Sequence, residues 1–558
     1  MSEFLRELGY NPLRYWLLAG STFVLWFAST VVLWKQGSRS VLRLNRPIVF
    51  GGLLLLTMFA WRWPALFFYK PVNPDEAQFL AAALTTLARG SLWWTDATTS
   101  GPLVVLPLTL PGLAGFPVDF IHGRLIALLL EWGTVFLGYL MLRHVHGDQK
   151  GRLLVLPLAC FIIFLSFWDF VPYCSELSPL FMSATAAWLG VTAFQPDGLV
   201  RSRGRLAASG LILGLIPFSK FQVLPLGAAI GFSTVIWILR QPAAKREAVV
   251  RDLLCLIGST IGGFGLMLAS LGLSGEWTHF YNSYVVHNLY YTQARGMPWS
   301  SSGYVLSYLT EISWGFSSFH YGALLLLILS FFGVRRAAWR PMMLGWVLVA
   351  AGYCAVLVPG RLYPHYLLFL SLPLSLLVGL QFGYLLETPS RFQRVTFIAL
   401  FLCIGMGTQL VDRLWERESL HKLIPVANAR QRVAGYINHT KQSGDALAVW
   451  GWRPELYVET QLPQASRESL TEAQLGDHPQ REYYRARFLS DLRANRPAFF
   501  VDSIGDDDYL MKDRARQGHE SFPELANYIR QEYESVGSDG SFRVYLRRDR
   551  RAAAPSVP

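Results

Sequence analysis

Long apolar runs fill roughly the first 410 residues of the chain, and short polar segments separate them. About twelve of these runs approach the length that a helix needs to cross a bilayer. The run over residues 206–240 is interrupted by Pro217 and Lys220, which favours two short, tilted helices there. The pattern predicts a polytopic α-helical membrane protein with spans near residues 13–33, 47–69, 121–142, 153–169, 177–194, 206–218, 223–240, 253–273, 316–333, 341–358, 366–386 and 395–411.

The pattern changes after about residue 411, where the remaining sequence is polar and of ordinary domain size. Short apolar runs with strand character alternate there with helical periodicity, which favours a small α/β layer domain. We therefore expect two domains, residues 1–411 in the membrane and residues 412–558 in water. The expected helices are 428–439, 484–495 and 522–534, and the expected strands are 446–450, 498–502 and 541–546.

Composition and charge support this division and also predict the orientation of the chain across the membrane. The chain is 52% hydrophobic and only 16% charged, with a formal net charge of +12. The positive charge is not arranged as in a nucleic-acid-binding surface, because it recurs in short loops between alternate apolar runs. That arrangement places these loops inside, and the segments around Asp75, Lys220, residues 274–302 and Arg361, with the tail, outside. The basic clusters are Lys35/Arg39/Arg43/Arg46, Arg143/Lys150/Arg152, Arg201/Arg203/Arg205, Arg240/Lys245/Arg246/Arg251, Arg335/Arg336/Arg340 and Arg391/Arg394.

The first outer loop begins with two adjacent carboxylates, Asp75 and Glu76. Capping alone explains them locally, because Asn73 suits an N-cap and Glu76 falls three residues later. Acid–base chemistry at the end of a membrane helix is the alternative. Apolar residues then recur at helical spacing to Arg89, before Gly90, and a second apolar segment covers residues 102–112. Both segments are expected to be interfacial helices.

The outer segment at residues 274–302 is rich in aromatic rings and amides, including Tyr284 and His287. Rings with polar edges suit sugar stacking, but they also suit a membrane interface. Both interpretations remain open from the sequence, and Tyr284 and His287 are candidate substrate-binding residues.

Taken together, the outer segments carry acids and cations that suit transfer from a phosphate leaving group. Cations would hold the phosphate while a carboxylate activates a hydroxyl. Each residue has a simpler explanation: Arg124 and Lys220 could extend to the interface, Glu176 could cap the following span, and His365 could be packed. The set comprises Asp75, Glu76, Asp96, Arg124, Glu176, Lys220, Arg361, Tyr363, His365 and Tyr366.

Several of these segments resemble GT-C membrane glycosyltransferases, in the branch of the protein O-mannosyltransferases and the lipid A aminoarabinose transferases. The resemblance covers nearly the whole chain in order, although no single motif is specific. It is carried by Pro74-Asp75-Glu76-Ala77-Gln78, Arg89-Gly90, Gly101-Pro102-Leu103, Lys220 after a Pro-containing span, Arg361-Leu362-Tyr363-Pro364-His365-Tyr366, and Trp450-Gly451-Trp452-Arg453-Pro454-Glu455-Leu456-Tyr457.

The resemblance implies a GT-C fold and transfer of a hexosyl or pentosyl group, with inversion, from a polyprenyl-monophosphate donor to a lipid, glycan or protein hydroxyl. Asp75 would be the general base and Glu76 would orient the site. Lys220, Arg361, His365, Tyr363 and Tyr366 would hold the donor phosphate, and Asp96, Arg124, Glu176, Tyr284 and His287 would contact substrate. The site would face the periplasm from a bacterial inner membrane.

The sequence departs from the family pattern in two places. One additional span precedes the acidic loop, and Ser100-Gly101 stands where some relatives carry a lysine before Pro-Leu. Some GT-C enzymes use a divalent metal, so a metal is an open expectation, although the acids here do not demand one. Two alternatives remain: a ligase or polymerase acting on polyprenyl-diphosphate glycans, and a transporter, although no internal repeat supports the latter.

Overall fold

The computed structural model describes residues 11–31, 46–68, 71–96, 99–164, 169–194, 200–241, 245–293, 314–331, 339–361, 363–387, 391–410, 429–477 and 479–553. The basic residues Lys35, Arg39, Arg43, Arg335 and Arg336 lie outside these ranges, as does the expected domain boundary at residue 411. The topology that the basic loops predict therefore stays a prediction.

The described chain forms two compact units, and each is treated by itself. The helical unit comprises Met1–Phe68, Arg124–Gly275 and Val286–Lys422. The α/β unit comprises Tyr69–Gly123, Glu276–Val285 and Leu423–Pro558. The polar tail thus shares its unit with the first and third of the expected outer segments, a grouping that hydropathy alone does not reveal.

Helix occupies every apolar run in the helical unit that was expected to cross the membrane. Six helical stretches of the described residues are long and apolar enough to do so: Pro47–Leu66, Phe120–His146, Phe221–Leu239, Arg246–Ser274, Pro364–Leu385 and Phe392–Leu410. They make the chain an integral membrane protein, and the count of about twelve crossings stays a prediction. The α-helices are α2 (Pro12–Val31), α3 (Pro47–Leu66), α6 (Phe120–His146), α7 (Asp148–Leu154), α8 (Leu156–Phe164), α9 (Leu177–Thr192), α10 (Arg203–Leu215), α11 (Leu224–Leu239), α12 (Arg246–Ser274), α14 (His287–Gln293), α16 (Trp314–Phe331), α17 (Trp339–Leu357), α18 (Leu368–Leu385) and α19 (Arg391–Leu402).

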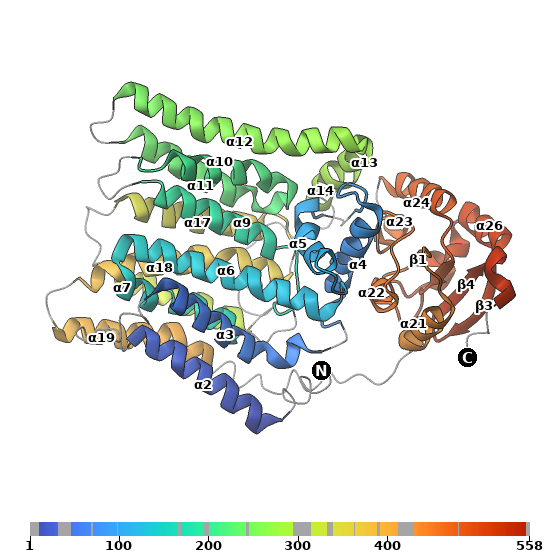
Figure 1. Cartoon of the computed structure of the whole chain (residues 1–558), viewed down its shortest axis with the longest axis horizontal. Coiled ribbons are helices and arrows are strands. Elements are labelled where there is room, and N and C mark those ends of the chain that lie inside the picture. Colours follow the sequence, from blue (N-terminus) through green and yellow to red (C-terminus); the bar gives the residue numbers. More distant parts are fainter. Residues whose placement is uncertain are drawn as a thin grey trace. The chain divides into compact units, whose positions relative to one another are not determined.

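Small residues allow the closest helix contacts of this unit, as is common between membrane helices. Helices α10 and α12 run side by side (Figure 1). A Cβ added at Gly214 would stand 2.1 Å from the carbonyl oxygen of Thr260, and one at Gly263 would stand 2.3 Å from that of Leu211. Any side chain at these positions would force the two backbones apart.

Breaks in the regular helices coincide with the candidate residues. Helix α10 ends in two 3-10 turns, Ile216–Phe218 and Phe221–Val223, with Lys220 between them. Another 3-10 turn, Pro364–Leu367, precedes α18 and contains His365 and Tyr366. Pro217 and Pro364 stand at the start of two of these turns and disfavour a continuous α-helix there. Lys220, His365 and Tyr366 are therefore carried on backbone that is not regular α-helix, a common arrangement at binding sites of membrane proteins.

The part of the α/β unit outside the tail contains α4 (Pro74–Arg89), α5 (Pro102–Leu113), α13 (Trp277–Phe280) and a π-helical turn, Tyr281–Val286. Gly90 ends α4 with a left-handed φ of 66°, as expected from the sequence. Helix α4 packs against α5 and α22 (Glu455–Thr460), and its Ala81 joins the core of the tail. Much of its apolar surface is thus buried in protein, and the contact of α4 and α5 with a bilayer stays a prediction.

The tail is a three-layer α/β fold around a four-stranded sheet of order β1-β2-β4-β3. Helices α21 (Ala429–Thr440) and α22 cover one face, while α24 (Arg481–Asn495) and α26 (Pro523–Glu532) cover the other (Figure 1). The strands β1 (Leu447–Trp450), β2 (Phe499–Asp502) and β4 (Phe542–Arg547) match the expected ones within one residue. One expectation is wrong: the helix expected over 522–534 ends at Glu532, because strand β3 (Tyr533–Asp539) pairs antiparallel with β4.

Candidate active site

The two acids that begin α4 have different surroundings. The side-chain oxygen of Asn73 accepts the N–H of Asp75 at 2.8 Å, so Asn73 is the N-cap as predicted. Glu76 is fully buried, and its carboxylate accepts the N–H of Val72 at 3.3 Å. Glu76 therefore stabilises the helix start, in a variant of the capping box. Asp75 is only half-buried, which leaves it the more accessible carboxylate of the pair.

In the helical unit, the predicted cation Lys220 forms a buried ion pair with the predicted acid Glu176. Its ammonium group also donates to the Ser175 hydroxyl at 2.7 Å. The carboxylate of Glu176 lies 4.0 Å from the Nε2 atom of His365. A buried charge pair of this kind is stable only while both partners remain, so any anionic ligand of Lys220 would compete with Glu176.

His365 is held from its other side by Asp169, an acid that the sequence did not single out. One carboxylate oxygen of Asp169 accepts the backbone N–H of His365 at 3.0 Å and lies 2.9 Å from the ring Nδ1. This contact favours a proton on Nδ1 and leaves Nε2 directed toward Glu176. The pattern alone could have revealed Asp169, because a lone carboxylate in an apolar run is costly and invites a functional explanation.

Aromatic rings connect this cluster to the remaining predicted phosphate ligands. The ammonium of Lys220 lies 4.8 Å from the centre of the Tyr366 ring, whose hydroxyl is 3.4 Å from that of Tyr291. The guanidinium of Arg361 stacks 4.4 Å from the Tyr291 ring and donates to its backbone carbonyl. Tyr363 and His287 extend the group by stacking on His365 and Tyr291, respectively. All five predicted phosphate-binding residues thus belong to one connected cluster, the Lys220 cluster.

The simpler explanations for Lys220, Arg124 and Glu176, extension to the interface for the two cations and helix capping for the acid, do not describe the observed contacts. Lys220 and Arg124 are buried rather than extended to an interface. Arg124 donates to the carbonyl oxygen of Ala65, in the last turn of α3, and to that of Phe68, just beyond the helix. Glu176 occupies the N-cap position of α9, but its side chain makes no capping hydrogen bond and pairs with Lys220 instead.

The other two predicted substrate residues, Asp96 and Tyr284, lie in the α/β unit, where they line one small cleft together with Arg487. The guanidinium of Arg487 donates to Asp96 at 2.8 Å, and also to Glu468 and to the Ser283 hydroxyl. It lies 4.8 Å from the ring centre of Tyr484. No sequence pattern pointed to Arg487, because only the fold of the tail brings α24 to the segments that carry Asp96 and Ser283.

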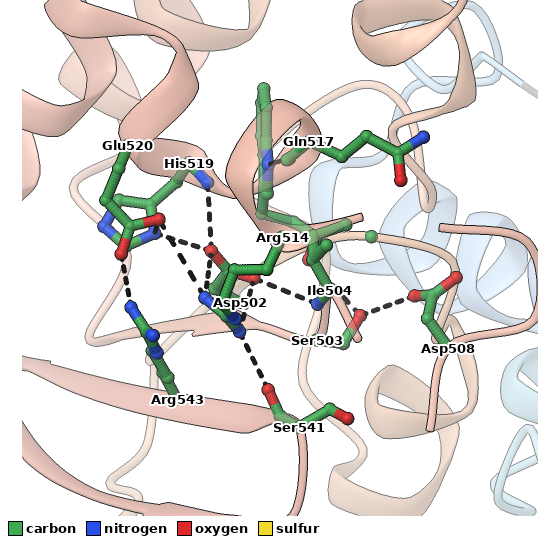
Figure 2. A network of polar contacts seen from close by, with 12 residues as sticks. Asp502, Ser503, Ile504, Asp508, Arg514, Gln517, His519, Glu520, Ser541 and Arg543 are labelled. Carbon is green, nitrogen blue, oxygen red and sulfur yellow. Dashed lines mark hydrogen bonds and ion pairs between the residues drawn. The ribbon is translucent and has the colours of Figure 1, made fainter. Parts of the chain in front are cut away.

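The described residues contain one group with the composition of a metal site, Asp502, His519 and Glu520 in the tail. Figure 2 shows that protein donors already surround it. Asp502 accepts from both terminal nitrogens of Arg514 and from the backbone N–H groups of Ile504 and His519. Arg543 donates to Glu520 as well. A cation would stand beside two guanidinium groups, so the group does not fit a metal; it stabilises the loop after β2.

The same loop contains Asp506, Asp507 and Asp508, an acidic run that is more typical of a solvated loop than of a cation site. Asp508 is buried and accepts the N–H groups of Trp452 and Met511, at 2.7 and 3.0 Å. It therefore anchors the loop rather than facing water, whereas Asp506 is exposed.

Comparison with known proteins finds similarity in structure only. No protein-family model and no curated protein sequence matches the chain. The crystal structure of ArnT from Cupriavidus metallidurans bound to undecaprenyl phosphate matches with a TM-score of 0.55 at 13% identity, over 93% of this chain and 100% of that one. The chain shares the fold of ArnT. The apo form gives a TM-score of 0.53 at 14% identity, over 89% and 97% of the two chains.

A third match is weaker: an oligosaccharyltransferase from Archaeoglobus fulgidus, with a TM-score of 0.46 at 10% identity over 82% of this chain and 68% of that chain. The two ArnT matches confirm the resemblance to GT-C proteins at the level of the fold. Their identities are too low to transfer a substrate, and the roles of individual residues rest on the contacts described above.

Proposed function

We propose that the chain is an inverting glycosyltransferase that moves a sugar from a polyprenyl-monophosphate donor to a hydroxyl of an envelope acceptor. The reaction would occur on the outer face of a bacterial inner membrane, with residues 1–411 as the catalytic domain and the tail in the periplasm. The observation that carries the proposal is the Lys220 cluster, in which cations, a histidine and tyrosine hydroxyls gather on helix breaks of an otherwise apolar unit.

The chemistry of that cluster suits a phosphate. Lys220 and Arg361 supply charged donors, Tyr363 and Tyr366 supply neutral hydroxyl donors, and His365, whose Nδ1 is held by Asp169, can donate from Nε2 in its imidazolium form. Tyr363 is 44% exposed, so the cluster has a face open to a ligand. When a phosphate enters, Lys220 would exchange its contact with Glu176 for one with the anion. The Ser175 hydroxyl would still donate to Glu176, and a protonated His365 would neutralise part of its charge. The ArnT structure of similar fold contains undecaprenyl phosphate, which agrees with a ligand of this class.

The base in this proposal is Asp75. Because phosphate leaves readily, the main proton transfer is removal of the proton from the acceptor hydroxyl, a task for a positioned carboxylate. Asp75 is half-buried, whereas the carboxylate of Glu76 already caps α4. We therefore assign the proton transfer to Asp75, and to Glu76 the task of holding the turn that carries it.

The test is a transfer assay with purified protein in lipid nanodiscs, labelled polyprenyl-monophosphate sugars and an envelope extract as acceptor. Asp75→Asn keeps the size of the side chain but loses the basic oxygen. We expect it to bind the donor and to transfer sugar ~10²–10⁴ times more slowly. Asp119→Asn is the matched control, because Asp119 also begins a helix, accepting the N–H of His122 at 2.9 Å. That variant should keep near wild-type transfer.

Two results would contradict the proposal in different ways. Wild-type transfer by Asp75→Asn would make Asp75 a helix-start residue only, and the base would have to be Glu76, Asp96 or Glu176. Transfer from diphosphate-linked glycans alone, with no use of any monophosphate donor, would identify a ligase or polymerase instead.

A further inference from the structure

The Lys220 cluster includes an anion, the carboxylate of Glu176, that the helix carrying it does not use. Glu176 stands at the N-cap position of α9, but its side chain makes no capping hydrogen bond. The Ser175 hydroxyl lies 3.1 and 3.2 Å from its two oxygens, and one of these oxygens pairs with Lys220. A carboxylate without a role in its helix is costly in an apolar unit, so it invites a functional explanation.

The charge of Glu176 stays in the cluster when Lys220 turns to a ligand. Ser175 precedes Glu176 in the chain, so its hydroxyl remains within reach of a carboxylate that is fully buried. His365 lies 4.0 Å from the same carboxylate and is held on its other side by Asp169. An anion bound by Lys220 therefore lies beside a second negative charge.

The charges of the cluster are already matched before a ligand enters, when they are counted over the residues that the structure describes. Lys220 and Arg361 are cationic, whereas Glu176 and Asp169 are anionic. A proton on Nε2 of His365 would bring the sum to one positive charge. The cluster can thus neutralise one negative charge of a ligand, and every further charge would be buried without compensation.

Lipid phosphates differ in this respect. A polyprenyl-monophosphate sugar is a phosphodiester with one negative charge. A free lipid monophosphate carries close to two charges at neutral pH, and a diphosphate-linked glycan carries one on each of its phosphates. The phosphodiester is the class whose charge matches the capacity of the cluster.

The distances make the difference in charge important. An anion and Glu176 that share the ammonium of Lys220, each in a contact of about 2.8 Å, are roughly 5 Å apart. At the effective dielectric constant of about 20 that suits proteins, one pair of unit charges at this separation changes an affinity by about 100-fold. Glu176 therefore cancels most of the attraction that Lys220 would exert on an additional negative charge.

We propose that Glu176 is a specificity-determining residue, whose charge restricts the Lys220 cluster to lipid phosphates with one negative charge and excludes diphosphates. The inference rests on the proposed function and deepens it, because it gives a physical reason for a monophosphate-linked donor. Specificity of this kind comes from a repulsive group that acts against the wrong ligand.

The same charge acts on the product of the proposed reaction. Transfer breaks the bond between the anomeric carbon and the phosphate oxygen, the electron pair stays on that oxygen, and the proton of the acceptor hydroxyl passes to Asp75. The leaving lipid phosphate therefore carries one more negative charge than the donor. Beside Glu176 it is bound less tightly than the donor, which favours its release.

Binding of three prenyl phosphates with the same chain tests the inference without turnover. The probes are farnesyl methyl phosphate, farnesyl phosphate and farnesyl diphosphate, titrated by calorimetry into the full-length protein in nanodiscs at pH 8, with empty nanodiscs as the reference. A chelator prevents divalent cations from masking the charge of the diphosphate. We expect the methyl diester to bind most tightly to the wild type and the diphosphate least, whereas cations without a counter-charge would give the reverse order.

Two variants separate the charge of Glu176 from its size. Glu176→Gln keeps the size and removes the charge, so the diphosphate should gain at least about tenfold in affinity relative to the methyl diester. Glu176→Asp keeps the charge on a shorter side chain, and the wild-type order should remain. Asp252→Asn is the control for loss of a buried carboxylate elsewhere in this unit, because Asp252 pairs with Arg203 at 2.7 Å. It should also keep the wild-type order.

Two results would overturn the inference. The first is an affinity of the wild type that rises with the charge of the probe, a result that needs no variant and is decisive even if Glu176→Gln does not fold. The second is an equal change for all three probes in Glu176→Gln, which would make Glu176 a structural partner of Lys220 only.

The binding and transfer assays together distinguish this inference from the proposed function. Transfer from a monophosphate donor, with no shift of selectivity in Glu176→Gln, would leave the glycosyltransferase standing and remove the role of Glu176. The expected order of affinities without any transfer would do the opposite. Absence of binding for all three probes would contradict both.

Discussion

Two buried ion pairs of the helical unit are similar in chemistry and different in surroundings. Arg62 of α3 pairs with Glu131 of α6, through both terminal nitrogens of the guanidinium, and also donates to the carbonyl oxygen of Ile162 at 3.0 Å. Lys220 pairs with Glu176, but on backbone that is not regular helix, beside Ser175, His365 and Tyr366. Residues of both pairs are nearly inaccessible to solvent.

Burial and charge alone therefore do not identify a binding site. The Arg62 pair joins two continuous helices, and the guanidinium links its own helix α3 to both α6 and α8. The Lys220 pair lies where helices break, next to further polar groups that can rearrange around a ligand. Breaks of this kind are where membrane proteins place polar ligands. We therefore interpret the first pair as a structural link and the second as part of a binding site.

The largest expected effect is on stability, from Arg62→Ala. Removing one partner of a buried pair leaves an uncompensated charge and typically costs 3–5 kcal/mol. We expect a large loss of folded protein in detergent, measured as yield and as thermal unfolding. Replacing both partners with leucine should recover most of the loss, because an apolar pair needs no compensation. Normal stability of Arg62→Ala would remove the distinction between the two pairs.

The next effect is on activity, from Lys220→Ala. Glu176 keeps the Ser175 hydroxyl and His365, so we expect a smaller stability loss than for Arg62→Ala. Loss of a charged contact to phosphate should weaken donor use by about 10- to 100-fold, and Arg361→Ala should act in the same direction. Transfer kinetics against donor concentration measure this. If both variants have wild-type kinetics, the phosphate is held elsewhere.

A smaller effect is expected from Asp169→Asn, which concerns orientation rather than charge at the ligand. The amide oxygen can still accept the N–H of His365, but the preference for a proton on Nδ1 weakens. We expect KM for the donor to rise by about two- to tenfold with kcat nearly unchanged, the cost of one ordinary hydrogen bond. An equal fall in kcat would show that Asp169 acts in the chemical step.

The smallest effect extends the comparison to a third buried pair, Glu468 and Arg487 in the α/β unit. Burial raises the pKa of Glu468 from its ordinary 4.5 to about 7, against the opposing charge of Arg487. Between pH 4.5 and about pH 7, Glu468 is protonated in the folded protein and ionised in the unfolded chain. Raising the pH through this window therefore favours unfolding. Thermal unfolding of the wild type should show this loss of stability from about pH 5 to 8.

The variant Glu468→Gln isolates the contribution of Glu468 to the pH dependence of stability. This is needed because the lowered pKa of His279 has the opposite effect: below the ordinary histidine pKa of 6.5, it makes stability rise with pH. Asp491, whose pKa is raised by burial, adds a contribution of the same sign as Glu468 at lower pH. We expect the variant to be less sensitive to pH between 5 and 8 than the wild type. Identical slopes would show that Glu468 keeps its charge throughout.

Much of the fold follows from local pattern. Hydropathy located every apolar helix, and Asn73 and Gly90 marked the two ends of α4, because a helix terminus is decided by a few neighbouring residues. Three strands of the tail were placed within one residue. Strand β3 was missed because residues 533–539 alternate weakly, with Gly537 and exposed polar positions, and pair only through β4.

The same distinction between local pattern and long-range packing applies to the candidate site. Residues that could bind phosphate or act as a base were recognisable from sequence, since charged side chains in apolar surroundings are conspicuous. The packing of distant segments was needed to show that Glu176 pairs with Lys220, that Asp169 holds His365, and that Asp96 pairs with Arg487. These partners are separated by 44, 196 and 391 residues for the pairs Glu176–Lys220, Asp169–His365 and Asp96–Arg487. Periodicity reports the environment of a residue along its own helix, whereas pairing depends on which helices and loops pack together.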